Sequence, residues 1–131
     1  MTQLRIAEAA DLLGVSTDTV RRAIEAGRLT AAKDTRGRTV VEGRDVAALA
    51  QDQAHPAEVG TIGSSSARNQ MRGVVTRVKS DLVMSQVDVQ AGPFRLVSLL
   101  STEAVEEMGL VPGSVVIASV KATHVTVGTP S

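Results

Sequence analysis

The chain has 131 residues, with 14 basic and 14 acidic side chains, so its formal net charge is zero. This balance excludes a uniformly basic nucleic-acid-binding protein, although six basic residues against two acidic ones between positions 21 and 38 leave a local basic edge. The absence of cysteine excludes disulfides and thiolate metal sites, and a single aromatic residue, Phe94, provides no platform for stacking single-stranded bases. The start of the chain does not resemble a signal peptide and no apolar run is long enough to span a membrane, so a cytoplasmic protein without a membrane partner is expected.

Two helices are predicted near the start of the chain. Residues 7–13 carry apolar side chains at helical spacing, and Gly14 ends this helix. Ser16 is expected to cap a second helix over residues 17–26, because its hydroxyl can accept a hydrogen bond from an amide two or three residues further on. Gly27 ends the second helix. Two short helices separated by three residues predict a helix-turn-helix.

A hairpin and a further helix follow. Residues 29–33 and 38–42 are compatible with strands, and the polar residues between them read as the tip of a hairpin. A short helix is expected at 44–50. Residues 53–65 contain proline, glycine and serine without an apolar period, which predicts a flexible linker.

The remainder of the chain, from residue 66, alternates like a sheet. In the first expected strand, Val74, Thr76 and Val78 should lie on one face, opposite Val75 and Arg77. The expected strands are residues 71–78, 83–89, 94–100, 114–120 and 123–127, with one short helix at 104–108. The chain is therefore expected to be a two-domain α+β protein, whose second domain is a five-stranded β-barrel of the oligonucleotide-binding type with one short helix.

Residues 4–16, continued by 17–22 and 27–29, resemble the winged helix-turn-helix family shared by MerR-type regulators and phage excisionases. The resemblance covers about residues 4–50 and implies binding to double-stranded DNA. The positions that it assigns to a DNA groove are Thr17, Thr19, Arg21 and Arg22, and those that it assigns to a basic wing are Lys33, Arg36 and Arg38. Ala23 departs from the family, which commonly has a large aromatic residue there, and Thr39-Val40 replaces a more basic wing. The alternative is that these cations form a solvated helix face and turn.

Donors for a tetrahedral oxyanion occur at three places in the second block. Ser66 and Arg68 precede the first strand, Ser101 opens the short helix, and residues 121–123 offer an ammonium group, amides and a hydroxyl. Each has an ordinary alternative when taken singly: a solvated turn, a helix cap and a surface lysine respectively. His124 is expected to be only an exposed strand residue.

These segments together resemble the Mop, or TOBE, domains of molbindins, molybdate-responsive regulators and molybdate transporter ATPases. The matching residues are 66–73, 101–105, 108–110, 112–113 and 120–125, so the resemblance covers nearly all of 66–127. It implies a site for molybdate or tungstate between subunits, and no covalently bound cofactor. One subunit would provide Ser66, Arg68, Lys121, the amide of Ala122, and Thr123, whereas Ser101 would come from the neighbour. Ala104 stands where some relatives have another hydroxyl.

The expected domains are a winged helix-turn-helix at 1–52, the linker at 53–65 and an oxyanion-binding domain at 66–128. A domain of this size buries little core alone, so a homo-oligomer of two to six subunits is expected. The leading hypothesis is a transcriptional regulator that senses molybdate or tungstate. The alternative is an intracellular storage or homeostasis protein without regulatory DNA binding. An enzyme is not expected, since no catalytic motif is present, and the donors suit a bare anion better than an assembled molybdopterin cofactor.

Overall fold

The computed structural model describes residues 2–54 and 66–130, which belong to two compact units, Met1–His55 and Pro56–Ser131. Within those ranges, no helix has the length and apolar character that crossing a membrane requires. Most of the predicted linker lies outside the described residues. Its first residue, Gln53, was wrongly placed there, because the helix before it continues through Gln53.

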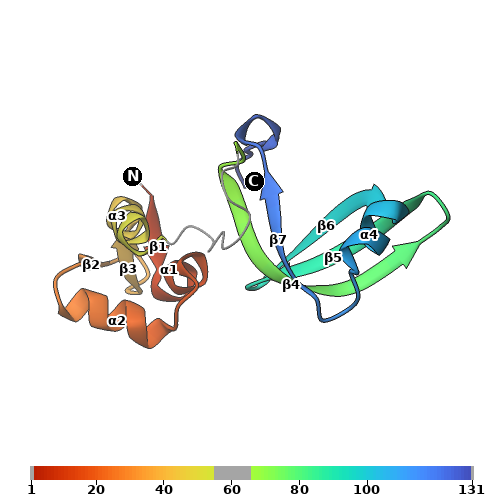
Figure 1. Ribbon diagram of the computed structural model, residues 1–131. Coiled ribbons are helices and arrows are strands. Elements are labelled where there is room, and N and C mark those ends of the chain that lie inside the picture. The colour runs from red at the N-terminus through yellow and green to blue at the C-terminus, as the bar shows by residue number, and fades with distance from the viewer. Residues whose placement is uncertain (1, 55–65, 131) are drawn as a thin grey trace. The chain divides into compact units, whose positions relative to one another are not determined.

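The first unit contains both predicted helices, α1 (Ile6–Leu13) and α2 (Thr17–Glu25) (Figure 1). Helix α1 ends at Gly14, whose φ of 68° lets its amide turn back to the carbonyls of the last turn. Ser16 caps α2 as expected: its hydroxyl oxygen accepts a hydrogen bond from the amide of Thr19 at 3.2 Å. The helix-turn-helix is therefore defined by local capping on both sides of the turn.

A three-stranded antiparallel sheet completes this unit, in the order β1 (Gln3–Arg5), β3 (Thr39–Glu42) and β2 (Ala31–Lys33). The β2–β3 hairpin matches the prediction, whereas β1 was missed because a three-residue strand carries too little alternation to be recognised. Helix α3 spans Gly43–Gln53, longer than expected at both ends.

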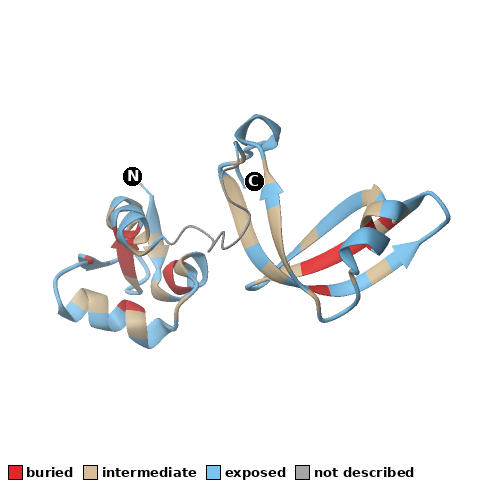
Figure 2. Cartoon of the chain, viewed as in Figure 1, coloured by how far each residue is buried: buried red, intermediate tan, exposed pale blue. Residues whose placement is uncertain are grey.

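The core of the first unit joins all three helices to the sheet (Figure 2). Its buried side chains are those of Ala9, Ala10, Val20, Leu29, Val41, Val46 and Leu49. Beside it, a cleft of about 250 Å³ opens where the small side chain of Ala23 meets Leu13 and Leu49. The small side chain of Ala23 leaves this volume unfilled.

We expect Ala23→Leu to stabilise the first unit by about 0.5–2 kcal/mol, since it adds buried apolar surface in an existing space. Differential scanning calorimetry should show a higher Tm for this unit. Ala7→Leu is a matched control, because Ala7 is a helical alanine that is exposed and away from the cleft. An equal gain in both variants would show that filling the cleft is not the cause, because leucine has a slightly lower helix propensity than alanine at either position.

The second unit is a curled antiparallel sheet with one helix, but it has four strands in the described residues and not five. The strands are β4 (Asn69–Ser80), β5 (Met84–Ala91), β6 (Phe94–Ser101) and β7 (Val115–Val120), in the order β6-β5-β4-β7. The prediction of a strand at residues 123–127 is wrong. A 3₁₀ turn, η1 (Ala122–His124), replaces it, because the amides of His124 and Val125 bond back to local carbonyls and not to a neighbouring strand. The sheet therefore ends at β6 and β7 without closing within one chain.

Strand β4 is long and curved because its two halves pair with different neighbours (Figure 1). Its first half pairs with β7 and its second half with β5, and the register shifts between Val75 and Arg77. This irregularity changes the predicted alternation. Val75 is buried and Val78 packs against the same core, although the alternation placed them on opposite faces.

Helix α4 (Thr102–Met108) is capped at both ends as predicted. The hydroxyl oxygen of Ser101 accepts a hydrogen bond from the amide of Ala104 at 3.1 Å, and Gly109 follows with a φ of 63°. The buried apolar core of this unit is small and consists of Val75, Val87, Val89 and Val105. So small a core is typical of a domain that relies on neighbouring subunits.

Candidate functional site

Two cationic side chains predicted for the oxyanion site flank one end of the second sheet. Asn69 of β4 faces Val120 of β7 in the register, so Arg68 and Lys121, the residues just beyond this pair, lie at the same end. The side chain of Asn69 also donates a hydrogen bond to the Val120 carbonyl at 3.1 Å, which fastens the two strands there. Arg68 and Lys121 are both exposed. A rigid strand pair thus holds two positive charges at one edge of the domain.

The η1 turn adds neutral donors beside Lys121. As the first residues of a 3₁₀ turn, Ala122 and Thr123 have amides without an acceptor inside it, and no acceptor for them occurs among residues 66–130. The Thr123 hydroxyl lies 3.5 Å from Nδ1 of His124. His124 is exposed as expected, but in this turn and not in a strand. Amides, a hydroxyl and a cation in sequence form a surface suited to an oxyanion.

Ser66 lies three residues before β4 and is exposed. Because Ser66 is only two residues before Arg68 in the chain, it lies near the same end of the sheet. The structure therefore gathers Ser66, Arg68 and the Lys121–Thr123 segment, which we call the Lys121 end of the sheet.

Ser101 lies at the other end of β4. It pairs with Met84 at the start of β5, next to the Ser80–Ser85 pair that ends β4. β4 has 12 residues, which corresponds to roughly 40 Å of strand at about 3.3 Å per residue. One chain therefore does not bring Ser101 to Lys121.

The hydrogen bonding of Ser101 leaves its hydroxyl proton available. Its oxygen accepts from the Ala104 amide, as an N-cap does, so the O–H group can donate outward. Ala104 contributes this amide but has no side-chain hydroxyl to add to the site. The side chain of Ser101 is exposed.

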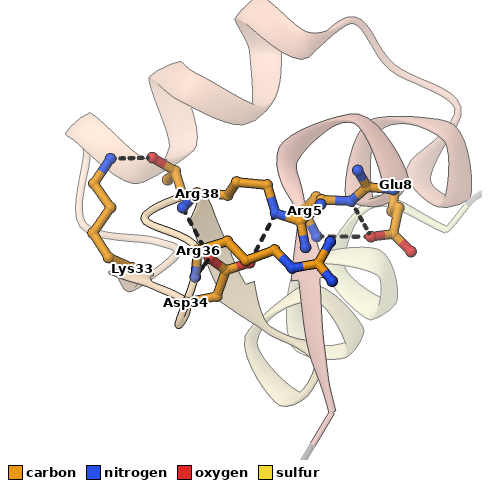
Figure 3. Close-up of polar contacts among 7 residues, drawn as sticks. Arg5, Glu8, Lys33, Asp34, Arg36 and Arg38 are labelled. Atoms are coloured by element: carbon orange, nitrogen blue, oxygen red, sulfur yellow. Dashed lines mark hydrogen bonds and ion pairs between the residues drawn. The ribbon is translucent and has the colours of Figure 1, made fainter.

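Two of the three hairpin residues predicted to contact DNA, Arg36 and Arg38, donate hydrogen bonds to one carboxylate. Asp34 accepts hydrogen bonds from the amides of Arg36 and Arg38, both at 2.9 Å, and from Nε of Arg38 at 3.0 Å (Figure 3). The hydrogen bond from the Arg38 amide, helped by that from the Arg36 amide, holds the pKa of Asp34 below its usual value, although desolvation acts in the opposite direction. Lys33 donates to the Thr39 hydroxyl at 2.7 Å. Of the three hairpin cations, Arg36 alone has a side chain without a partner among residues 2–54.

The α2 residues predicted to enter a groove differ in availability. Thr17, Arg21 and Arg22 are exposed, whereas Thr19 is half-buried and its hydroxyl lies 2.9 Å from that of Ser16. Arg21 pairs with Asp18 at 3.4 Å on the helix surface. No hydrogen bond or ion pair among residues 2–54 joins these α2 residues to the hairpin cations, so they form two separate polar groups.

Sequence reasoning missed two charged residues of the first unit, Arg5 and Glu8. Arg5 donates through both its amide and Nε to Glu8, at 3.2 and 3.1 Å, at the start of α1. The bond from the Arg5 amide is the main reason why the pKa of Glu8 is lowered, and Arg38 contributes through its charge. The glutamate three residues after the residue preceding a helix is a capping-box spacing, which could have pointed to this pair.

Comparisons with known proteins divide the chain in the same way. Residues 4–54 match the helix-turn-helix domain family, and residues 65–127 match the TOBE domain. Molybdenum-pterin-binding proteins 2 and 3 of Clostridium pasteurianum are 38% and 37% identical over 65 residues, which is 49% of this chain and 96% of each relative. The solved structure of a molybdate binding protein from Sporomusa ovata is 30% identical, covers 50% of this chain and 98% of its own, and has a TM-score of 0.49.

The two relatives thus correspond almost completely to the second unit, and the first unit has its own family match. Because the chain covers nearly the whole of these relatives at more than a third identity, it belongs to the TOBE-domain family, with a helix-turn-helix domain on the N-terminal side.

Proposed function

We propose that this protein binds molybdate or tungstate between subunits and uses the occupied site to regulate DNA binding. The proposal rests on one observation: the predicted oxyanion donors are divided between the two ends of β4. Arg68, Lys121 and the amides of Ala122 and Thr123, which have no acceptor among residues 66–130, lie at one end of β4. Ser101 lies at the other end. The names of the two Clostridium relatives support a molybdenum ligand. A second subunit would supply Ser101 and complete the site.

The donor chemistry favours a bare dianion. Two cations balance its charge, while amides and hydroxyls donate to its oxygens without adding further charge. Exposed side chains on paired strands can reach an anion without large rearrangement. The lack of an aromatic residue in residues 66–130 other than the exposed Phe94 gives a pterin ring little to stack upon.

Arg68→Ala and Lys121→Ala are each expected to weaken molybdate binding by about tenfold or more, because each removes a charge-assisted hydrogen bond to the anion. Isothermal titration calorimetry with molybdate, tungstate and sulfate would measure this. Arg77→Ala is the matched control, since Arg77 is an exposed cation in the middle of β4, away from both ends of the strand. Unchanged affinity in both site variants, or no binding by the parent, would refute the site.

DNA binding is proposed for the helix-turn-helix unit, with Arg36 as a backbone-contacting residue. Arg36→Ala should weaken binding to double-stranded DNA at every sequence and lower the salt dependence by about one counterion. Arg38→Ala should cost less, because the Arg38 guanidinium is already engaged by Asp34. Fluorescence anisotropy at several salt concentrations distinguishes these results, and Arg77→Ala, outside the helix-turn-helix unit, again serves as control. Equal losses in Arg36→Ala and Arg38→Ala would contradict this assignment.

Regulation and storage give different results in one further measurement. A regulator binds its DNA with an affinity that changes with molybdate, because the anion must bind the two arrangements unequally. A storage protein takes up the anion with no such change. Upstream genomic DNA, titrated with and without molybdate, separates the two functions.

A further inference from the structure

The end of β1 brings Arg5 beside the cations of the β2–β3 hairpin. In the antiparallel sheet of the first unit, Arg5 pairs with Val40 and Lys33 pairs with Thr39. Arg38 directly precedes Thr39, which is the first residue of β3. The last residues of β1 and β2 therefore lie at the end of the sheet where β3 begins. Three strands thus place Arg5, Lys33 and Arg38 along one short edge.

The guanidinium groups of Arg5 and Arg38 are held in the same way. Arg5 donates through Nε to the carboxylate of Glu8 at 3.1 Å. Arg38 donates through Nε to the carboxylate of Asp34 at 3.0 Å. The terminal nitrogens of both arginines make no hydrogen bond or ion pair among residues 2–54, and the two side chains are 53% and 46% exposed. A guanidinium fixed at Nε keeps two N–H groups side by side, which suit the oxygens of a phosphate.

Positive charge is in excess at this end of the sheet. Figure 3 shows the side chains of Arg36 and Arg38 extending from the hairpin toward Arg5. We define the Arg5 edge as four cations: Arg5, Lys33, Arg36 and Arg38. Only two carboxylates, those of Glu8 and Asp34, are paired with them. Residues 2–54 as a whole have eight basic and eight acidic side chains, so the first unit is polarised and its Arg5 edge attracts a polyanion.

We propose that Arg5 binds a DNA phosphate and extends the phosphate-contacting surface of the hairpin to the start of α1. This inference rests on the proposed DNA binding of the helix-turn-helix unit. The DNA backbone is the ligand because it offers a row of phosphates to a row of cations, whereas a single small anion would engage only part of the Arg5 edge. Glu8 holds Arg5 in place by accepting hydrogen bonds from both its amide and its guanidinium.

Arg5→Ala is expected to weaken binding to double-stranded DNA by about threefold or more and to lower its salt dependence, because one phosphate contact is lost. The loss should be smaller than that of Arg36→Ala, since Glu8 already engages Arg5. Fluorescence anisotropy with a labelled duplex of arbitrary sequence measures both effects, because phosphate contacts do not depend on sequence. Arg44→Ala is the matched control, because Arg44 is an exposed cation beyond the opposite end of β3.

Glu8→Gln is expected to change DNA binding in the opposite direction. The amide and Nε of Arg5 both donate to the same oxygen of Glu8, Oε1, so the amide oxygen of glutamine can accept both bonds. The substitution therefore keeps Arg5 in place and removes one negative charge from beside the Arg5 edge. DNA binding should strengthen by about threefold or more and depend more steeply on salt. Glu42→Gln is the matched control, because Glu42 lies at the opposite end of β3.

The signs of the two effects decide whether Arg5 contacts DNA. Weaker binding by Arg5→Ala together with stronger binding by Glu8→Gln, each beyond its control, supports the contact, because partial unfolding would weaken both variants. A parent that binds DNA while both variants match their controls overturns the role of Arg5 and leaves DNA binding by the unit in place. A parent that binds no DNA at low salt refutes the proposed DNA binding, and the Arg5 contact with it.

Discussion

Two variants that each bind molybdate only weakly are expected to form high-affinity sites again when they assemble together. In Ser101→Ala and Lys121→Ala homo-oligomers, every site lacks one donor. If a site takes Ser101 from one chain and Lys121 from another, random mixing leaves both donors intact in about a quarter of the sites. Co-expression of the two variants followed by calorimetric counting of high-affinity sites would measure this fraction.

The double variant Ser101→Ala/Lys121→Ala, co-expressed with the parent, is the control. A site shared between chains again leaves about a quarter of the sites intact. A site built within one chain would leave about half intact with this pair and none with the two single variants. Stoichiometry alone therefore decides whether subunits share the site, independently of the number of subunits.

A large loss of stability is expected from a substitution at Gly73, in the first half of β4. A Cβ atom added there would lie 2.7 Å from the Gln90 carbonyl oxygen and 2.7 Å from Cγ1 of Val89. Because one of these atoms is backbone, relief requires β5 to move away from β4. We expect Gly73→Ala to destabilise the second unit by about 2–4 kcal/mol, as overpacking of a core does.

Urea unfolding, monitored by far-ultraviolet circular dichroism, would measure the loss of stability caused by Gly73→Ala. Gly128→Ala is the matched control, because a Cβ at Gly128 meets nothing within 4 Å. A Gly73→Ala variant as stable as the parent would show that the two strands do not approach so closely. The same variant should also weaken molybdate binding, since Arg68 directly precedes β4.

Local features of the sequence were enough to predict the helices and most strands. Ser16, Gly14 and Gly109 act within a few residues of their own positions, so their capping roles can be read without tertiary information. The β2–β3 hairpin was predicted for the same reason. The missed strand β1 has no such signal, because it exists only through pairing with β3, far along the chain.

The alternation of β4 shows where local reasoning ends. A regular period placed Val75 and Val78 on opposite faces, but the register shift between Val75 and Arg77 turns both toward the core. A bulge depends on which strand pairs on each side, and this is not a property of the segment itself. The absent fifth strand has a related cause, because the 3₁₀ turn at Ala122–His124 satisfies its amides locally.

For the candidate site, side-chain chemistry and the family resemblance predict the donors Ser66, Arg68, Ser101 and the Lys121–Thr123 segment. Their distribution in space could not be predicted in the same way and follows from the fold. The antiparallel register puts Arg68 beside Lys121, and the length of β4 keeps Ser101 at the opposite end. Pairing between distant strands sets these positions, and the sequence of any one strand does not contain that information.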